Sequence, residues 1–189
     1  MKIGLFFGSF NPIHIGHLAI ANYMVEFSDI DKIWFVVSPQ NPFKTKHNLL
    51  AEHHRLRLVD IAIEDDLRFK SSNIEFHLPK PSYTIDTLTY LKEKYPNEIF
   101  VLIMGEDNLK GLHKWKNYEK IIDDYAIYVY PRDYKTTETN PFKNITLIEA
   151  PKIEVSASFI RNAIKNKQDV RYFMHHKVAQ YVEEMHFYE

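Results

Sequence analysis

Cysteine is absent from this chain of 189 residues. A disulfide framework and thiolate metal sites are therefore excluded, and the cytoplasm is the expected compartment. No apolar run approaches the ~20 residues that a membrane-spanning helix needs. The apolar run at Ile3–Phe7 is too short for the core of a signal peptide, so it is interpreted as a buried first strand.

An excess of charge of one sign is also missing. Lys and Arg total 24, Asp and Glu total 25, and the formal net charge is −1. Proteins that coat nucleic acid usually carry a strong basic excess, so a nucleic-acid-binding module is disfavoured. Any phosphate-binding site in this chain must depend on a few cations placed locally.

Glycine is scarce, with five residues in the chain. The sequence contains neither the Gly-x-x-x-x-Gly-Lys phosphate loop nor the Gly-x-Gly-x-x-Gly dinucleotide fingerprint. The Gly-x-Ser-x-Gly turn of many hydrolases is absent as well. The commonest glycine-based phosphate sites and that hydrolase nucleophile are therefore excluded.

Short apolar runs rich in Ile, Val and Phe recur along the chain. Each is brief and nearly continuous, which is typical of strands buried on both faces. The runs predict strands at Ile3–Phe7, Ile33–Val37, Ile99–Met104, Ala126–Tyr130 and Ile145–Ile148.

Between these runs, apolar residues are spaced as on one face of a helix. Strands that alternate with helices predict an α/β fold, a Rossmann-like doubly wound parallel sheet with right-handed crossovers. We expect residues 1–189 to form a single domain, with a C-terminal helical segment from about 156 to 189. The predicted helix faces are Leu18, Ala21 and Val25; Leu56, Val59 and Ile63; Thr84, Thr87, Leu88 and Leu91, ending near Tyr95; Phe159, Ile160, Ala163 and Ile164; and Val178, Tyr181 and Val182.

The segment that follows the first strand reads Gly-Ser-Phe-Asn-Pro-Ile-His-Ile-Gly-His, from Gly8 to His17. Ligands of parallel sheets bind beyond the carboxyl ends of strands, and a helix N-terminus at that edge attracts phosphate. Gly8 would permit a tight turn and a close approach of the backbone to a ligand. Gly16 has no side chain, which would leave room for a purine or a phosphate.

Two histidines in this segment, His14 and His17, are three residues apart and would share one face of a helical turn. Their imidazoles could donate hydrogen bonds to a polyphosphate and stabilise charge that develops during phosphate chemistry. A surface or core pair is the structural alternative, and a metal site is another, although the sequence places no third ligand.

This segment resembles the Gly-Thr-Phe-Asp-Pro-x-His-x-Gly-His motif of the nucleotidyltransferase superfamily. A second segment, Val155–Arg161, is similar to the Ile-Ser-Ser-Thr-x-Ile-Arg motif of the same superfamily. Ser156 and Ser158 both suit a helix N-cap. Arg161 would then lie near the first helical turn, where its guanidinium could grip a phosphate.

Two further segments resemble the bacterial nicotinate mononucleotide adenylyltransferases within that superfamily. Pro81–Leu88 is similar to their Ser-Tyr-Thr-x-x-Thr-Leu segment, and Gly105–Leu109 with Trp115 is similar to their Gly-x-Asp-x-Leu…Trp segment. The resemblance spans almost the whole chain. The departures are Phe7 for a frequent Gly, Asn11 for Asp, Ala157 for Ser and Phe43 for a common His.

The resemblance implies transfer of AMP from ATP to nicotinate mononucleotide, giving deamido-NAD and pyrophosphate in NAD biosynthesis. The attacking 5′-phosphate is already an anion, so no general base is required. Catalysis would come from alignment and charge neutralisation. Mg²⁺ is expected to accompany the ATP phosphates without a metal site on the protein. No nucleic-acid or membrane partner is expected.

The resemblance also implies residue roles. Asp107 would bond the adenosine ribose, and Lys44 would reach the mononucleotide phosphate, with Lys46 as its alternative and Arg132 as a further nucleotide-site candidate. The implied catalytic residues are His14, His17 and Arg161; the implied ATP-binding residues are Gly8, Ser9, Phe10, Asn11, His14, His17, Gly105, Asp107, Ser158 and Arg161; the implied nicotinate mononucleotide-binding residues are Lys44, Thr84 and Trp115.

Alternative functions are phosphopantetheine adenylylation, another adenylyl or cytidylyl transfer, and a non-catalytic nucleotide sensor. The Ser-Tyr-Thr segment and Trp115 disfavour the other transfers, and His14, His17 and Arg161 disfavour the sensor. The choice between the acid and the amide acceptor, the oligomeric state and the extent of loop closure stay open. Arg55 and Arg57, on the second predicted helix, are interpreted as salt-bridge partners.

Overall fold

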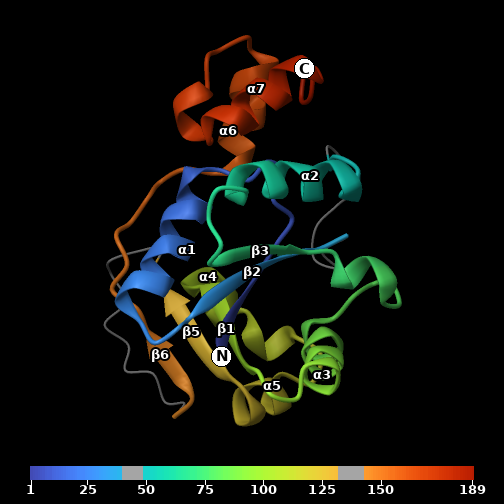
Figure 1. Cartoon of the computed structure of the whole chain (residues 1–189), viewed down its shortest axis with the longest axis vertical. Helices are drawn as coiled ribbons and strands as arrows, with labels where there is room; N and C mark the ends of the chain where they lie inside the picture. The colour runs from blue at the N-terminus through green and yellow to red at the C-terminus, as the bar shows by residue number, and fades with distance from the viewer. Residues whose placement is uncertain (40–48, 132–142) are drawn as a thin grey trace.

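The computed structural model describes residues 1–39, 49–131 and 143–189. Its centre is a sheet with the strand order β3-β2-β1-β4-β5-β6, in which every paired strand is parallel (Figure 1). The strands are β1 (Lys2–Gly8), β2 (Lys32–Val37), β3 (Phe69–Ser72), β4 (Ile99–Gly105), β5 (Ala126–Tyr130) and β6 (Ile145–Leu147). The predicted doubly wound parallel sheet is confirmed.

Helices cover both faces of the sheet (Figure 1). Helices α1, α2, α6 and α7 contribute to one hydrophobic cluster, and α3 and α5 contribute to a second cluster. The α-helices are α1 (Ile15–Phe27), α2 (Glu52–Ile63), α3 (Thr84–Lys94), α4 (Glu106–Lys110), α5 (Tyr118–Asp124), α6 (Ala157–Lys165) and α7 (His176–Glu184). The 3₁₀-helices are η1 (Ile74–His77), η2 (Leu112–Lys114) and η3 (Arg171–Phe173).

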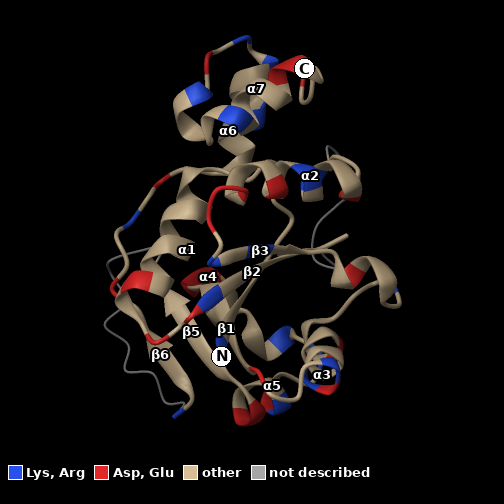
Figure 2. Ribbon diagram, viewed as in Figure 1, with Lys and Arg blue, Asp and Glu red and all other residues tan. Residues whose placement is uncertain are grey.

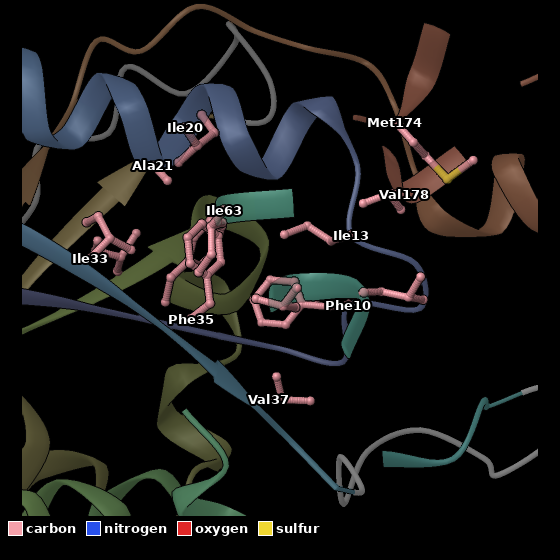
Figure 3. Close-up of a cluster of buried hydrophobic side chains, with 14 of the residues drawn as sticks. Phe10, Ile13, Ile20, Ala21, Ile33, Phe35, Val37, Ile63, Met174 and Val178 are labelled. Atoms are coloured by element: carbon pink, nitrogen blue, oxygen red, sulfur yellow. The ribbon is translucent and has the colours of Figure 1, made fainter. Parts of the chain in front are cut away.

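The first cluster joins the sheet to the C-terminal helices. Phe35 of β2 and Ile20 of α1 pack in it with Phe10, which comes from the turn after β1 (Figure 3). Met174 and Val178 enter the same cluster from η3–α7 (Figure 3). The helical segment predicted from about residue 156 therefore shares its core with the sheet.

The strand order reverses beside β1. The chain runs from β1 outward to β2 and β3, and then crosses to β4 on the other side of β1. The connections that leave β1 and β4 diverge at their carboxyl ends, which opens the crevice where ligands of such sheets bind. The segment that begins at Gly8 lies at this point.

Basic and acidic residues are interspersed along the ribbon of the described chain (Figure 2). This distribution agrees with the near-zero net charge of the sequence. Within residues 1–39, 49–131 and 143–189, no helix is both long and apolar enough to cross a membrane.

Candidate active site

The turn after β1, residues 8–12, is tight and has a strained backbone. Phe10 has a φ of 44°, in the left-handed region that bulky residues rarely adopt. Its ring is buried, and a Cβ on Gly8 would approach that ring to 2.8 Å. The room left by Gly8 is thus taken by the ring of Phe10, while Gly8 itself lines a cavity. Phe10 can join an ATP site only through its backbone.

The two histidines lie together at the start of α1. His14 is the N-cap of the helix, and the imidazole rings stack with centroids 3.7 Å apart. The backbone N–H of His14 donates to Nδ1 of His17 at 3.2 Å. Because Nδ1 accepts this bond, the proton of a neutral His17 lies on Nε2, which makes Nε2 a hydrogen-bond donor.

Gly16 accommodates the ring of His14. A Cβ at this position would lie 3.1 Å from two atoms of that imidazole. The missing side chain therefore serves the close packing of the histidine, and Gly16 also lines a cavity beside it.

The second motif meets the turn in space. Ser156 caps α6 by accepting the backbone N–H of Phe159 at 3.1 Å, as the sequence predicted for a cap. Arg161, one turn further on, donates to the backbone carbonyl of Asn11 at 2.8 Å and to Oγ of Ser158 at 3.2 Å. Residues 150 positions apart are thereby joined, and a guanidinium is held against the turn.

Two cavities are lined by successive parts of the segment from Gly8 to His17, the first by the start of the turn and the second by the start of α1; Asn11, Ser158 and Arg161 line neither. The first has a volume of about 320 Å³ and the second about 340 Å³, within the usual range for small-molecule sites. The first is lined by Gly8, Ser9, Ser38, Tyr83, Thr84, Asp107 and Trp115, among others. The second is lined by His14, Gly16, His17, Tyr130, Lys152 and Ser156, among others.

The first cavity brings together two segments that the sequence singled out. Thr84 is the first residue of α3, whose first N–H groups have no partner within the helix and carry partial positive charge. Trp115 follows η2 and lines the same cavity. Asp107 lines this cavity as well, although the sequence assigned it to ATP, and Gly105 caps α4 at the end of β4.

Lys44, Lys46 and Arg132 lie outside the described residues. The proposed role of either lysine on the mononucleotide phosphate stays a prediction, and so does the assignment of Arg132.

Arg55 has a structural role that sequence reasoning missed. It is fully buried, and its guanidinium donates to four backbone carbonyls. The acceptors are Leu50 at 2.8 Å, Ser9 at 2.6 Å, Ser38 at 2.8 Å and Pro39 at 3.1 Å. The salt-bridge interpretation of Arg55 is therefore wrong, because these carbonyls take its hydrogen bonds. Burial lowers the pKa of the guanidinium.

Glu75, in η1, is the second residue that sequence reasoning missed. Its side chain is buried in the wall of the first cavity. Its carboxylate accepts hydrogen bonds from Oγ of Ser82 at 3.1 Å and from Oγ1 of Thr87 at 2.9 Å. Burial raises the pKa of this carboxyl. No motif signals the residue, because only the fold brings it against the start of α3.

Comparison with known proteins agrees with the fold and the motifs. A family model described as cytidylyltransferase-like matches residues 5–163. The chain is 53% identical to a probable nicotinate-nucleotide adenylyltransferase of Flavobacterium johnsoniae, over 100% of both chains. It is 51% identical to a protein of the same description from Cytophaga hutchinsonii, over 100% of this chain and 98% of that one.

The fold is also that of a solved enzyme. The structure of Plasmodium falciparum nicotinic acid mononucleotide adenylyltransferase complexed with NaAD superposes with a TM-score of 0.83. The superposition covers 99% of this chain and 97% of that one, at 23% identity. With a family model over most of its length and relatives more than half identical from end to end, the chain belongs to the cytidylyltransferase-like family and, within it, to the nicotinate-nucleotide adenylyltransferases.

Proposed function

We propose that the protein transfers AMP from ATP to nicotinate mononucleotide, with release of pyrophosphate and formation of deamido-NAD. The observation that carries the proposal is the pair of cavities lined by neighbouring parts of the segment from Gly8 to His17. Gly8 and Ser9 line the first cavity, and His14 and His17 line the second. Two nucleotides placed in these cavities would bring their phosphates together at the turn.

ATP would occupy the second cavity. The Nε2–H of His17 would donate to the α-phosphate and to the charge that develops on it, with His14 beside it. Arg161, with Ser158, would hold the β- and γ-phosphates. A bond forms between an oxygen of the mononucleotide phosphate and the α-phosphorus, while the bond from the α-phosphorus to pyrophosphate breaks. No proton has to move, so the site needs alignment and positive charge more than a base.

Nicotinate mononucleotide would occupy the first cavity. The pyridine ring would stack on Trp115. The carboxylate would meet Thr84 and the N-terminus of α3, whose partial positive charge favours an anion. This arrangement favours the acid over the amide. Asp107 would bond a ribose hydroxyl at the border of the two nucleotides.

Mg²⁺ fits this site as a companion of the ATP phosphates. The described residues contain no group of three or more His, Asp or Glu side chains that could hold a metal. Asn11 stands where the family motif has Asp, and its amide oxygen accepts two hydrogen bonds from the protein. The ion would therefore be bound mainly through phosphate oxygens, where it would neutralise charge on the pyrophosphate leaving group.

The acceptor assignment separates this proposal from its rivals. Phosphopantetheine and phosphorylated alcohols have no planar anionic ring to place between Trp115 and α3. Nicotinate mononucleotide has one, so the lining of the first cavity favours it. We also propose that the enzyme is cytoplasmic, since a chain without cysteine cannot use the disulfides that stabilise many secreted proteins.

Pyrophosphate release tests the proposal. The protein is incubated with ATP and Mg²⁺ and with nicotinate mononucleotide, nicotinamide mononucleotide or phosphopantetheine. We expect release with nicotinate mononucleotide at least tenfold faster than with the amide, and none with phosphopantetheine. A preference for phosphopantetheine would overturn the acceptor assignment, and silence with all three would favour a cytidylyl transfer or a nucleotide sensor.

A further inference from the structure

The turn after β1 is held by side chains from three distant segments. Arg55 of α2 donates to the carbonyl of Ser9, and Arg161 of α6 donates to the carbonyl of Asn11. A third contact comes from Tyr188, which follows α7 and donates its hydroxyl proton to Oδ1 of Asn11 at 2.9 Å. A backbone with a left-handed Phe10 is costly by itself and persists where its surroundings fix it.

Tyr188 is strained on its own side of this contact. Its φ is 70°, a conformation that costs free energy for a bulky residue. Strained backbone therefore lies at both ends of the contact, at Phe10 beside Asn11 and at Tyr188 itself. Such strain recurs at functional sites, where the geometry of a contact matters more than its net stability.

The side-chain oxygen of Asn11 is buried and accepts two hydrogen bonds. Asn11 is 4% exposed, and its Oδ1 also accepts the backbone N–H of Leu50 at 3.2 Å. Two donors from different segments thus fix the orientation of this amide. The backbone carbonyl of Asn11 accepts a hydrogen bond from Arg161. The contacts that hold the Asn11 side chain therefore also help to fix the position of the Arg161 guanidinium.

Burial of Tyr188 keeps its hydroxyl protonated and able to donate a hydrogen bond. Burial raises the pKa of Tyr188, while the guanidiniums of Arg161 and Arg55 act in the opposite direction. Burial is the larger effect, so the phenol stays protonated at neutral pH. The same two arginines that bind the turn thus lie close enough to Tyr188 to influence it.

We propose that Tyr188 is a positioning residue for the ATP phosphates. It acts through Asn11, whose backbone holds Arg161, and it touches neither substrate. The inference rests on the proposed function, in which Arg161, with Ser158, holds the β- and γ-phosphates. It requires that loss of the hydroxyl weaken ATP binding and leave mononucleotide binding unaffected, because the proposed function assigns Arg161 to the ATP phosphates. Asn11, Arg161 and Tyr188 line neither of the two cavities, so the effect has to reach ATP through the guanidinium.

A purely structural role makes a different prediction. The ring of Tyr188 packs against the first hydrophobic cluster, beside Phe187. Tyr188→Phe keeps this packing and removes only the hydroxyl. If the ring alone mattered, the variant would equal the wild type.

Steady-state kinetics of Tyr188→Phe are the first test. We expect the KM for ATP to rise about five- to tenfold, because a change of this size corresponds to the loss of roughly one hydrogen bond. The KM for nicotinate mononucleotide should stay within about twofold of the wild type. Tyr172→Phe is the matched control, because Tyr172 lies in the same segment and is 84% exposed. Unchanged ATP kinetics, or an equal rise in both KM values, would overturn the proposal.

A double-mutant cycle tests the route through Asn11. Asn11→Ala removes the acceptor, so Tyr188→Phe should add less than about twofold in that background. A full additional loss would show that Tyr188 acts by another route and would overturn the proposal. The cycle stands even if one variant loses stability, because the melting temperatures of all four proteins are measured and the assay is run well below the lowest of them.

Binding of a non-hydrolysable ATP analogue with Mg²⁺, measured by calorimetry without acceptor, separates the two proposals. Weaker binding by Tyr188→Phe supports the positioning role even if nicotinate mononucleotide is not the acceptor. Equal binding by variant and wild type, together with turnover of nicotinate mononucleotide, would leave the proposed function standing and refute the role of Tyr188.

Discussion

At the scale of single residues, the proposed function assigns the charge stabilisation to His17. Its Nδ1 accepts the backbone N–H of His14, so a neutral His17 carries its proton on Nε2, the donor that we assign to the α-phosphate. Loss of one such donor typically costs about 100-fold or more in kcat. We expect this loss for His17→Ala, with the mononucleotide KM within about threefold of the wild type. His53→Ala is the control, since His53 is exposed on α2. An equal loss in kcat and in mononucleotide affinity would remove the transition-state role.

Trp115 tests the assignment of the first cavity. Trp115→Ala removes the stacking surface for the pyridine ring, so the mononucleotide KM should rise about tenfold while the ATP KM changes less than about twofold. Trp115→Phe keeps an aromatic face and should recover most of the loss. Should the ATP KM rise instead, the two nucleotides would have to exchange cavities. Kinetics with each substrate varied in turn decide between these outcomes.

Arg55 tests how far the turn depends on its buried support. Arg55→Met keeps the apolar stem but leaves four carbonyls without their donors. We expect the free energy of unfolding to fall by about 3 kcal/mol, because buried polar groups lose their partners. Arg57→Met, on the exposed face of the same helix, should change it by less than about 0.5 kcal/mol. Urea denaturation measures both, and equal values would mean that the carbonyls find other partners.

At the scale of elements, the apolar patterns predicted β1, β2, β4, β5 and β6 within one or two residues. They also predicted the helix faces of α1, α2, α3, α6 and α7, except that Phe159 of α6 is 48% exposed. Strand β3 was missed because Phe69–Ser72 is a half-exposed edge with one apolar residue. Helices α4 and α5 were missed because they have five and seven residues, too few to show a helical period. Local pattern thus predicts the elements that are long and buried.

The candidate site residues divide in the same way, into those that lie in contiguous motifs and those that only the fold brings together. The motifs around His14, Arg161, Thr84 and Trp115 are contiguous in sequence and were recognised there. Tyr188 acts through contacts with residues far away in the chain, and so do Arg55 and Glu75. From the sequence alone, a buried Arg or Glu cannot be told from an exposed one, because both residue types usually lie on the surface. Sequence therefore predicts the groups that meet substrate better than the groups that hold them.

Glu75 gives a prediction at the junction of η1 and α3. Burial raises the pKa of its carboxyl above the ordinary value of 4.5, so the folded state holds this proton more tightly than the unfolded state. The contribution of Glu75 to stability is then fully present below the unfolded pKa and is lost as pH rises through the folded pKa. As pH rises from about 4.5 toward neutrality, the wild type should therefore lose stability relative to Glu75→Gln. Urea denaturation at several pH values measures it, with the exposed Glu93→Gln as baseline, and a flat difference would contradict it.

At the scale of the whole molecule, the C-terminal helices complete the site. Arg161 comes from α6 and Tyr188 follows α7, and both bind the turn after β1. Helix α7 packs on α2, which carries Arg55. Any undocking of these helices would remove the contacts of Arg161 and Tyr188 with Asn11 at once. The geometry thus supports the proposal that the chain folds as one domain, because docking of the helices and formation of the site depend on the same core.

Val178 and the two tryptophans make this proposal testable. Val178 of α7 is fully buried in the first cluster, whereas Trp34 lies in the second cluster and Trp115 packs against it. Val178→Ala should lower the free energy of unfolding by about 2 kcal/mol, the cost of two lost methyl groups and a partly filled cavity. In one cooperative domain, tryptophan fluorescence across the sheet must report the same shift in urea midpoint as far-UV circular dichroism. Gln180→Ala, exposed on the same helix, should shift neither signal. If dichroism alone moved, the helices would unfold independently of the sheet, and the site would lose Arg161 and Tyr188 under conditions in which the sheet persists.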